Sequence, residues 1–278
     1  MKNNIYTNEK IDKLSYKKFI RLFGVDRMTF NQIQQTIDRK CILIHANKRG
    51  RKKKYSAREI TIIFLLYIRQ YKPMEDYAFE WNVSKSVICE YIHFALDALL
   101  ESKNFTLFGK KSVKSDDSEG RLLDVTEIRI LRPKYEQRKK YSGKKKYHTM
   151  KIQIIKGQTT GFIYEIQVGA GAEHDFHLFK RTFEGSPNNV TYTADLGYLG
   201  INKIHSNSKI PKKKSKKSPL SEEDIKYNKE LGANRIFIEH TNGWIKRFKI
   251  LGLTFRNKLN YFAKFAVLIC SFYNLYKA

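Results

Sequence analysis

Apolar side chains in the first hundred residues recur at intervals of three and four, which is the period of one face of an α-helix. Phe30, Ile33 and Ile37 form one such face. Ser56 and Glu59 have the spacing of a capping box, which opens a helix, and Pro73 prevents that helix from continuing. The pattern predicts helices over residues 11–24, 26–39, 57–71, 74–81 and 85–100.

The helices between residues 56 and 100 have the spacing of a helix-turn-helix. Asn82 tolerates the left-handed conformation that a tight turn requires, and Ser84 is a favourable N-cap for the helix that follows. In that geometry Lys85 and Ser86 face outward at the start of the helix that reads base edges. The alternative interpretation is an ordinary three-helix bundle.

The pattern changes after residue 120. Segments 121–131, 147–156 and 162–168 alternate as strands do, and a turn at 158–161 makes them an antiparallel meander. Further elements follow in the order helix, strand, short strand and three helices, at residues 174–183, 189–195, 209–212, 221–231, 234–249 and 258–276. This order predicts an α/β (α+β) fold, an RNase H-like domain with a mixed five-stranded sheet over residues 121–278. Residues 106–120 are then a linker after a helical region of residues 1–105.

The net charge of the chain indicates what kind of partner it binds. The chain has 54 Lys and Arg against 27 Asp and Glu, a formal net charge of +27, which indicates a polyanion or an anionic membrane surface. A membrane is disfavoured, because the longest apolar run, residues 60–68, is far shorter than the ~20 residues of a spanning helix.

The cysteines and the first residues bear on the cellular compartment. Cys41, Cys89 and Cys270 are widely spaced and fit free thiols in a reducing cytosol, rather than a zinc site. The N-terminus has no apolar stretch that would form a secretory signal. We therefore expect a cytoplasmic protein without a membrane partner.

Three acids, Asp124, Asp195 and Glu239, end or interrupt apolar segments. A lone carboxylate in such a place loses its hydration, so it shifts its pKa or takes a cation as partner. Three of them in so basic a chain suggest convergence on a divalent metal, whose open positions then bind phosphate oxygens. The basic surface indicates nucleic acid as the source of the phosphates.

The segment around Glu239 predicts a polar stripe on an otherwise apolar helix. Arg235 and Lys246 stand four residues before and seven after Glu239, so all three share a face, with Asn242 between them. Such a stripe is typical of a helix that packs beneath an active site.

Other polar residues are candidates for supporting roles. Lys212, Lys213 and Lys214 precede the last helices and are expected to contact DNA that flanks the cut. His174 and Asp175 follow a glycine turn and could ligate a metal, although a His at a helix start more often makes local hydrogen bonds.

A series of short motifs runs from residue 120 to 256. They are Leu-Asp-Val-Thr-Glu-Ile-Arg-Ile-Leu-Arg-Pro at 123–133, Tyr-Ser-Gly-Lys-Lys-Lys-Tyr-His-Thr-Met-Lys at 141–151, Gly-Ala-Glu-His-Asp at 171–175, Ala-Asp-Leu-Gly-Tyr at 194–198, Ile-Pro-Lys-Lys-Lys at 210–214 and Arg-x-x-x-Glu at 235–239 with Lys246. In this order the chain resembles the DDE-superfamily transposases of bacterial insertion sequences, the branch related to Harbinger-type elements. One departure is Gly232, where a related signature often has Tyr.

The resemblance implies a mechanism. Asp124, Asp195 and Glu239 would be the triad that holds two Mg²⁺ ions, for which Mn²⁺ can substitute. Arg235 and Lys246 would clamp a phosphate, and Asp175 would support the site.

The resemblance also implies a DNA transposase that acts at the nucleoid. It would bind the terminal inverted repeats of its element, cleave the ends by metal-dependent hydrolysis and join the 3′ ends to target DNA, as a homodimer or higher oligomer on DNA. The alternatives are a non-catalytic DNA-binding protein, either a regulator or an inactive remnant, and a nuclease that lacks strand transfer.

Overall fold

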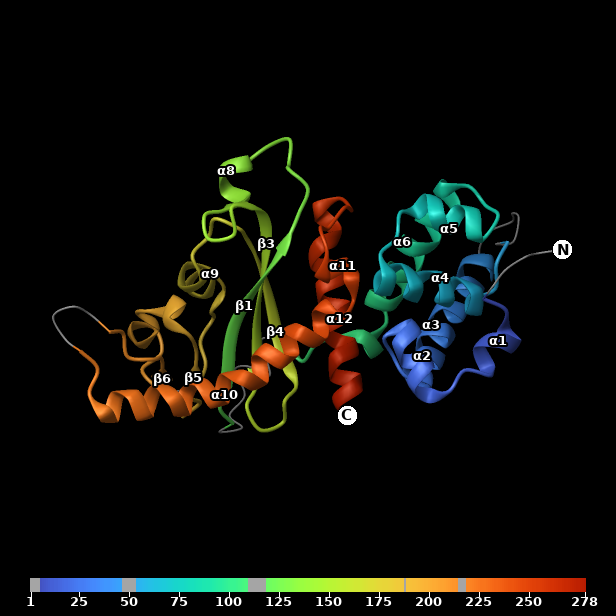
Figure 1. The fold of residues 1–278 in the computed structure, drawn as a ribbon. Helices are drawn as coiled ribbons and strands as arrows, with labels where there is room; N and C mark the ends of the chain where they lie inside the picture. Colours follow the sequence, from blue (N-terminus) through green and yellow to red (C-terminus); the bar gives the residue numbers. More distant parts are fainter. Residues whose placement is uncertain (1–5, 47–53, 110–118, 188, 215–218) are drawn as a thin grey trace. The chain divides into compact units, whose positions relative to one another are not determined.

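A computed structural model describes residues 6–46, 54–109, 119–187, 189–214 and 219–278. The chain divides into two compact units (Figure 1). The helical unit comprises residues 1–106, 246–253 and Ala278, and the sheet unit comprises residues 107–245 and 254–277. The segment 246–253 falls within the predicted domain 121–278 in sequence, yet its contacts group it with the helical unit.

The helical unit is built around a helix that is buried on nearly every side. Its elements are α1 (Asn8–Asp12), α2 (Tyr16–Phe23), α3 (Arg27–Ala46), α4 (Ala57–Gln70), α5 (Met74–Glu80), α6 (Lys85–Glu101), the 3-10 turn η1 (Lys103–Phe105) and α11 (Lys249–Gly252). The central helix α4 packs against α2, α3, α6 and α11. Its predicted capping box is confirmed, because Ser56 accepts from the Glu59 amide and Glu59 accepts from the Ser56 amide.

The turn between α5 and α6 has the predicted geometry. Asn82 is left-handed, with φ at 48°, and the Ser84 hydroxyl accepts a hydrogen bond from the Val87 amide at 3.4 Å. Trp81, directly before the turn, is buried against Tyr55. The helix-turn-helix shape is therefore present, while its binding to DNA stays a prediction.

The sheet unit follows the predicted order of strands and helices. Its elements are β1 (Arg121–Arg129), α8 (Gln137–Lys140), β2 (Tyr141–Ser142), β3 (Tyr147–Gly157), β4 (Ile163–Ala170), α9 (Asp175–Thr182), β5 (Tyr192–Thr193), η2 (Leu196–Tyr198), η3 (Ile201–Lys203), β6 (Ser208–Lys209), α10 (Glu222–Lys246), η4 (Leu259–Tyr261) and α12 (Phe262–Lys277). The last residue of α10, Lys246, is grouped with the helical unit.

The sheet is mixed. Its order is β2-β3-β1-β5-β6, and β4 pairs with β3. Strands β1, β3 and β4 form the predicted antiparallel meander, whereas β5 is parallel to β1 and β6 is parallel to β5. The described residues form six strands rather than the predicted five, because the two-residue β2 adds to one end of β3. The α/β (α+β) class, with a mixed sheet of the RNase H-like kind after an all-helical region, is confirmed.

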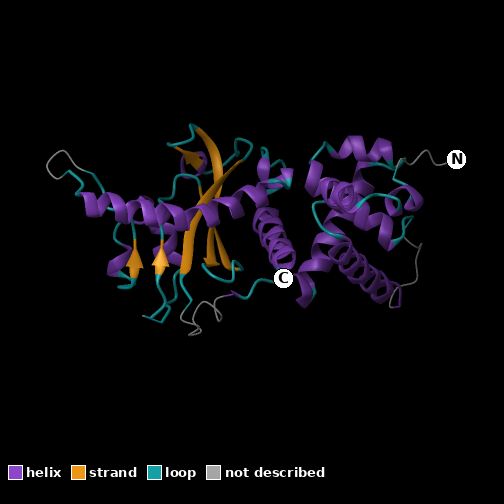
Figure 2. Cartoon of the chain, turned by 60° about the horizontal axis from the view of Figure 1, so that its bottom comes forward, coloured by secondary structure: helices purple, strands orange, loops and turns teal. Residues whose placement is uncertain are grey.

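The two helices predicted at 221–231 and 234–249 are one helix, so that prediction was wrong. Helix α10 continues through Gly232, which has no positive φ. Apart from its chain neighbours and the nearby backbone of the same helix, no described atom lies within 4 Å of the position that its Cβ would take. A glycine inside a helix costs only about 1 kcal/mol relative to alanine, so it need not end one. In Figure 2 α10 runs as one long helix across the strands.

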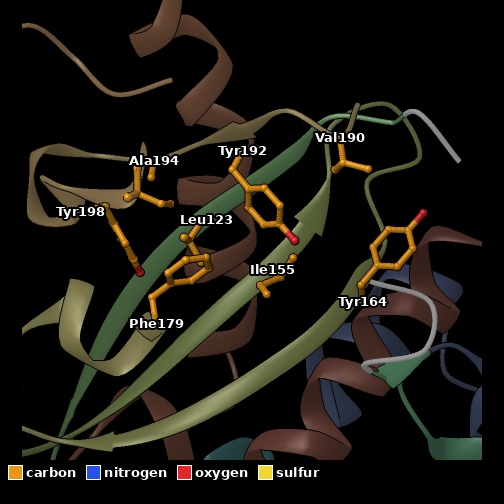
Figure 3. Packing of buried hydrophobic residues seen from close by; sticks show 9 residues of the cluster. Leu123, Ile155, Tyr164, Phe179, Val190, Tyr192, Ala194 and Tyr198 are labelled. Atoms are coloured by element: carbon orange, nitrogen blue, oxygen red, sulfur yellow. The ribbon is translucent and has the colours of Figure 1, made fainter. Parts of the chain in front are cut away.

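A cluster of buried apolar and aromatic side chains fills the side of the sheet that α9 covers. Figure 3 shows members of the cluster between the strands and α9. Its members are Leu123, Ile155, Tyr164, Phe179, Val190, Tyr192, Ala194, Tyr198 and Ile201. Since successive strand residues point to opposite faces, Asp124 points away from this cluster when Leu123 points into it.

The last helix packs into the sheet unit. Helix α12 lies against β4, and its buried side chains include Phe265, Ile269 and Phe272. In the part of the chain that the structure describes, no helix combines the length and the apolar character needed to cross a membrane.

Candidate active site

The register of two parallel strands brings the first two acids of the triad together. Strand β1 pairs with β5 so that Leu122 lies opposite Thr193. Asp124 and Asp195 each stand two residues further along, so both carboxylates come at the same level of the sheet. The chain turns into η2 at Asp195, whose carboxylate accepts a hydrogen bond from the Gly197 amide at 2.8 Å.

Helix α10 covers the face toward which Asp124 points. The side-chain amide of Asn242 donates to Asp124 Oδ2 at 2.7 Å. Asn242 lies three residues after Glu239, which places both on one side of the helix. Strand β1 and α10 are thus joined at the carboxylate that the sequence marked as the first acid of the triad.

Arg235 lies between the other two acids. Its Nη2 atom is 4.0 Å from Asp195 Oδ2 and 3.8 Å from Glu239 Oε1. The Arg235 side chain is 22% exposed, against 31% for Asp195 and 57% for Glu239. The three predicted acids therefore lie around one guanidinium, with Asp124 the most enclosed and Glu239 the most open to solvent.

The environment of Asp124 makes its ionisation costly. The pKa of Asp124 is raised from 3.8 to about 6, chiefly by burial. The charges of Asp195 and Glu239 also raise this pKa, while the Arg235 charge and the hydrogen bond from the Val125 amide lower it. Carboxylates of like charge raise one another's pKa only when they are close enough to interact. The three acids thus form one electrostatic group.

The donor types fit a hard divalent cation, because they are carboxylate oxygens with an amide oxygen nearby. Two buried polar atoms beside the acids, Arg235 Nε and Asn242 Oδ1, have no hydrogen-bond partner among the described residues. Yet no group of three His, Cys, Asp or Glu in that part of the chain is close enough to hold a metal. Arg235 occupies the space among the acids, so a cation would need this side chain to turn aside.

Asp175 lies beside the same loop. The Lys151 ammonium is 2.8 Å from Asp175 Oδ1, and a Cβ at Gly197 would lie 3.1 Å from Asp175 Oδ2 and 2.8 Å from Asp195 Oδ1. Gly197 therefore has to lack a side chain for the two acids to approach. His174 takes the N-cap position of α9 and is exposed, without a capping hydrogen bond from its side chain to the described residues.

Two residues at this site carry roles that the sequence analysis did not assign. Lys151 is buried on β3 and holds Asp175. Tyr198 is fully buried, and its pKa is raised by burial and by the charges of Asp175, Asp124 and Asp195. The signal in the sequence is that each of them ends one of the motifs, Lys151 the segment 141–151 and Tyr198 the segment 194–198. Lys151 on an apolar strand gives no sign of its partner.

The predicted DNA contacts of the helix-turn-helix lie on its surface. Lys85 and Ser86 are exposed at the first turn of α6. Lys85 pairs with Glu75 at 2.5 Å, and both side chains are about 60% exposed. An exposed pair of this kind contributes at most about 1 kcal/mol, so Lys85 can exchange it for a phosphate. Lys246, the last residue of α10, is also exposed.

The basic cluster of Lys212, Lys213 and Lys214 is anchored to α10. Asn228 accepts from the Lys212 amide at 2.7 Å and donates to its carbonyl at 3.1 Å. Lys212, Lys213 and Lys214 are exposed, and their side chains are therefore available to a polyanion. A further basic run spans residues 48–54, of which residues 48–53 lie outside the described residues.

Comparison with known proteins identifies the family of the chain. The family model described as transposase DDE domain matches residues 115–275. A protein from Microchaete diplosiphon, named as a probable transposase for insertion sequence element IS702, is 36% identical over 268 residues, which is 96% of each chain. No solved structure matches the chain significantly. The chain belongs to the family of transposases with a DDE domain.

Proposed function

We propose that this transposase binds the terminal inverted repeats of its element, cleaves the ends by metal-dependent hydrolysis and joins the 3′ ends to target DNA. The supporting observation is the convergence of Asp124, Asp195 and Glu239 around Arg235, on elements far apart in the sequence. Family membership supports transposition in general. The individual steps are this proposal.

The three carboxylates would hold Mg²⁺, with Mn²⁺ as a substitute. When bound, such cations ready a water or a DNA 3′-hydroxyl for attack and stabilise the leaving oxygen. Asn242 would keep Asp124 oriented through its 2.7 Å hydrogen bond. Arg235 would leave the acids and bind the reacting phosphate by its two-pronged guanidinium, and Lys246 would add a charge contact to DNA.

The remaining candidates would position the DNA. Lys85 and Ser86 would contact the terminal repeat, and Lys212, Lys213 and Lys214 the backbone that flanks the cut. Because two element ends must react together, we propose a homodimer or higher oligomer on DNA. The protein would work where chromosomal DNA is, at the nucleoid.

The test is charge removal at each acid. In the full chain, Asp124→Asn, Asp195→Asn and Glu239→Gln should each slow Mg²⁺-dependent cleavage of terminal DNA by about 100- to 1000-fold, since a preorganised electrostatic contact at a reacting group is worth that much. Binding to the same DNA should stay unchanged. Glu230→Gln, an exposed position on α10, is the control and should keep the wild-type rate.

The outcomes separate the alternatives. Near-normal cleavage in two of the three variants would refute the triad. Wild-type cleavage without joining would indicate a nuclease that lacks strand transfer. DNA binding without any cleavage would indicate a non-catalytic DNA-binding protein.

A further inference from the structure

The helical unit contains a pocket of about 500 Å³ with a concentrated positive charge. Its described lining has five cationic side chains and no acid, and all of it belongs to the helical unit. The lining residues are Leu14, Lys18, Arg21, Leu22, Arg69, Gln70, Arg247 and Lys249. They come from α2 and the residue before its N-cap, from the end of α4, and from the segment that follows α10.

Tight packing holds these segments together. Gly24 ends α2 with φ at 81°, and a Cβ there would lie 2.7 Å from the ring of Phe248. Phe248 is buried, and the Arg69 guanidinium lies over its ring at 5.7 Å. A side chain at residue 24 would therefore displace Phe248, the residue between the two cations Arg247 and Lys249.

Arg69 is fixed by backbone acceptors on both sides of the pocket. Its Nε donates to the Arg21 carbonyl at 3.3 Å, and its Nη1 donates to the Arg247 carbonyl at 2.5 Å. The guanidinium thus crosses from the end of α2 to the segment after α10. The central cation of the pocket is preorganised and does not rely on an acid to hold it.

Among the described residues, no acid pairs with the positive charges of this pocket. Within the described part of the chain, none of the five cations forms an ion pair with an acid. Burial lowers the pKa of Arg69, and the charge of Arg247 lowers it further. The ends of α2 and α4 each contribute about half a negative charge, which offsets roughly one cation of the five.

We propose that this pocket binds the phosphodiester backbone of DNA, at a place on the helical unit other than the predicted recognition helix. Four of its cations, Lys18, Arg21, Arg247 and Lys249, are exposed and can meet phosphates, while Leu14 and Leu22 suit the apolar side of a sugar. In Figure 1, α2 and α5 lie at opposite ends of the helical unit. The choice of DNA over a small anion rests on the proposed function.

The test uses the full chain in EDTA, so that cleavage plays no part. Binding to labelled terminal DNA is measured by fluorescence anisotropy across a series of salt concentrations. Each lysine or arginine contact to a phosphate adds about 0.9 to the slope of log affinity against log salt. The double variant Lys18→Ala, Arg247→Ala removes two exposed charges, and we expect its slope to fall by about two.

The control is Lys10→Ala, Lys17→Ala, which removes two exposed lysines of α1 and α2 that do not line the pocket. Its slope should match the wild type, and melting curves should show that both variants fold. Equal loss of slope in both doubles, or none in the pocket double, would refute the proposal.

Titration with inorganic phosphate and with deoxyadenosine monophosphate separates the two sources of phosphate. If the pocket variant lost affinity for these small anions but kept its DNA salt slope, the pocket would be a small-anion site, and the proposal would be refuted. If the pocket variant kept the wild-type salt slope and the wild-type protein cleaved terminal DNA normally, the proposal for the pocket would be refuted and the proposed function would stand. If the pocket variant had a lowered salt slope but the wild-type protein did not cleave terminal DNA, the result would count against the proposed function and not against the pocket.

Discussion

The two charged sites of this protein are organised in opposite ways. In the sheet unit, three acids lie around Arg235 and Asn242, so the site carries its own positive and polar partners. In the helical unit, five cations gather with no acid in the described lining. In the first site Arg235 partly compensates the negative charge of the acids, whereas in the second no acid of the described lining compensates the positive charge.

Exposure explains why both arrangements are tolerated. Asp124 is enclosed, so its charge is costly and its pKa rises to about 6. Four of the pocket cations are exposed, so water screens their repulsion, whereas burial lowers the pKa of the partly buried Arg69. Compensation is therefore needed where a charge is buried and can be omitted where it is solvated.

The largest expected effect is the dependence of stability on pH at Asp124. Its pKa in the folded protein, about 6, lies above its usual 3.8. Between these values the folded state keeps a proton that the unfolded state has lost, so stability falls as pH rises through this window. The difference of about two in pKa corresponds to about 3 kcal/mol.

Urea unfolding in EDTA checks this effect. The stability of Asp124→Asn relative to wild type should rise by about 3 kcal/mol between pH 4 and 7. Exposed Asp76→Asn is the control for loss of a carboxylate. If the difference in unfolding free energy between Asp124→Asn and wild type stayed constant with pH, Asp124 would not be an enclosed carboxylate with a raised pKa, and the contrast with the exposed pocket cations would fail.

The next effect concerns the internal partner of the acid site. Asn242→Ala removes the 2.7 Å hydrogen bond that orients Asp124. We expect cleavage to slow by about 10- to 100-fold, the usual loss when a group that orients a metal ligand is removed. Glu230→Gln, at an exposed position elsewhere on α10, is the comparison variant.

A positioning role for Asn242 also predicts a change in metal dependence. The Mg²⁺ concentration for half-maximal cleavage should increase in Asn242→Ala, while the melting temperature changes little. A lower melting temperature with an unaltered Mg²⁺ requirement would contradict the role, because it would indicate packing alone.

The smallest effect compares one arginine from each site. Arg235→Gln should destabilise the protein at pH 8 by about 1 kcal/mol, because Asp195 and Glu239 lose their shared partner. Arg247→Gln should not destabilise it, because the charge of the Arg247 side chain repels that of Arg69. Thermal melts at low salt show whether each variant is less or more stable than the wild type. Both differences in melting temperature should shrink at high salt, which screens the charges. If the two variants lost the same amount of stability, the two arginines would not differ in their electrostatic role, contrary to the comparison.

Much of the fold could be predicted because it depends on local pattern. The start of α4 follows from Ser56 and Glu59, and the turn before α6 follows from Asn82, since capping and left-handed turns involve only neighbouring residues. Helix α10 was predicted as two helices because Gly232 resembles a stop signal. Packing along the rest of the helix outweighs the small cost of that glycine.

The strand that carries Asp195 shows the limit of pattern. Residues 189–195 were predicted as a strand, but β5 is limited to Tyr192–Thr193. The aromatic residues around it are held by packing in the buried cluster rather than by a long ladder of backbone hydrogen bonds. Apolar character thus predicted burial correctly and strand length poorly.

The sequence by itself determined which side chains are chemically unusual: acids in apolar segments, a polar stripe on one helix and a large excess of cations. Only the tertiary structure decided what these side chains meet. The Arg235 guanidinium lies between Asp195 and Glu239. The Arg247 carbonyl accepts a hydrogen bond from Arg69, which is 178 residues away in the chain. Local patterns specify elements because their interactions span a few residues, whereas charge compensation depends on distances that exist only after the chain has folded.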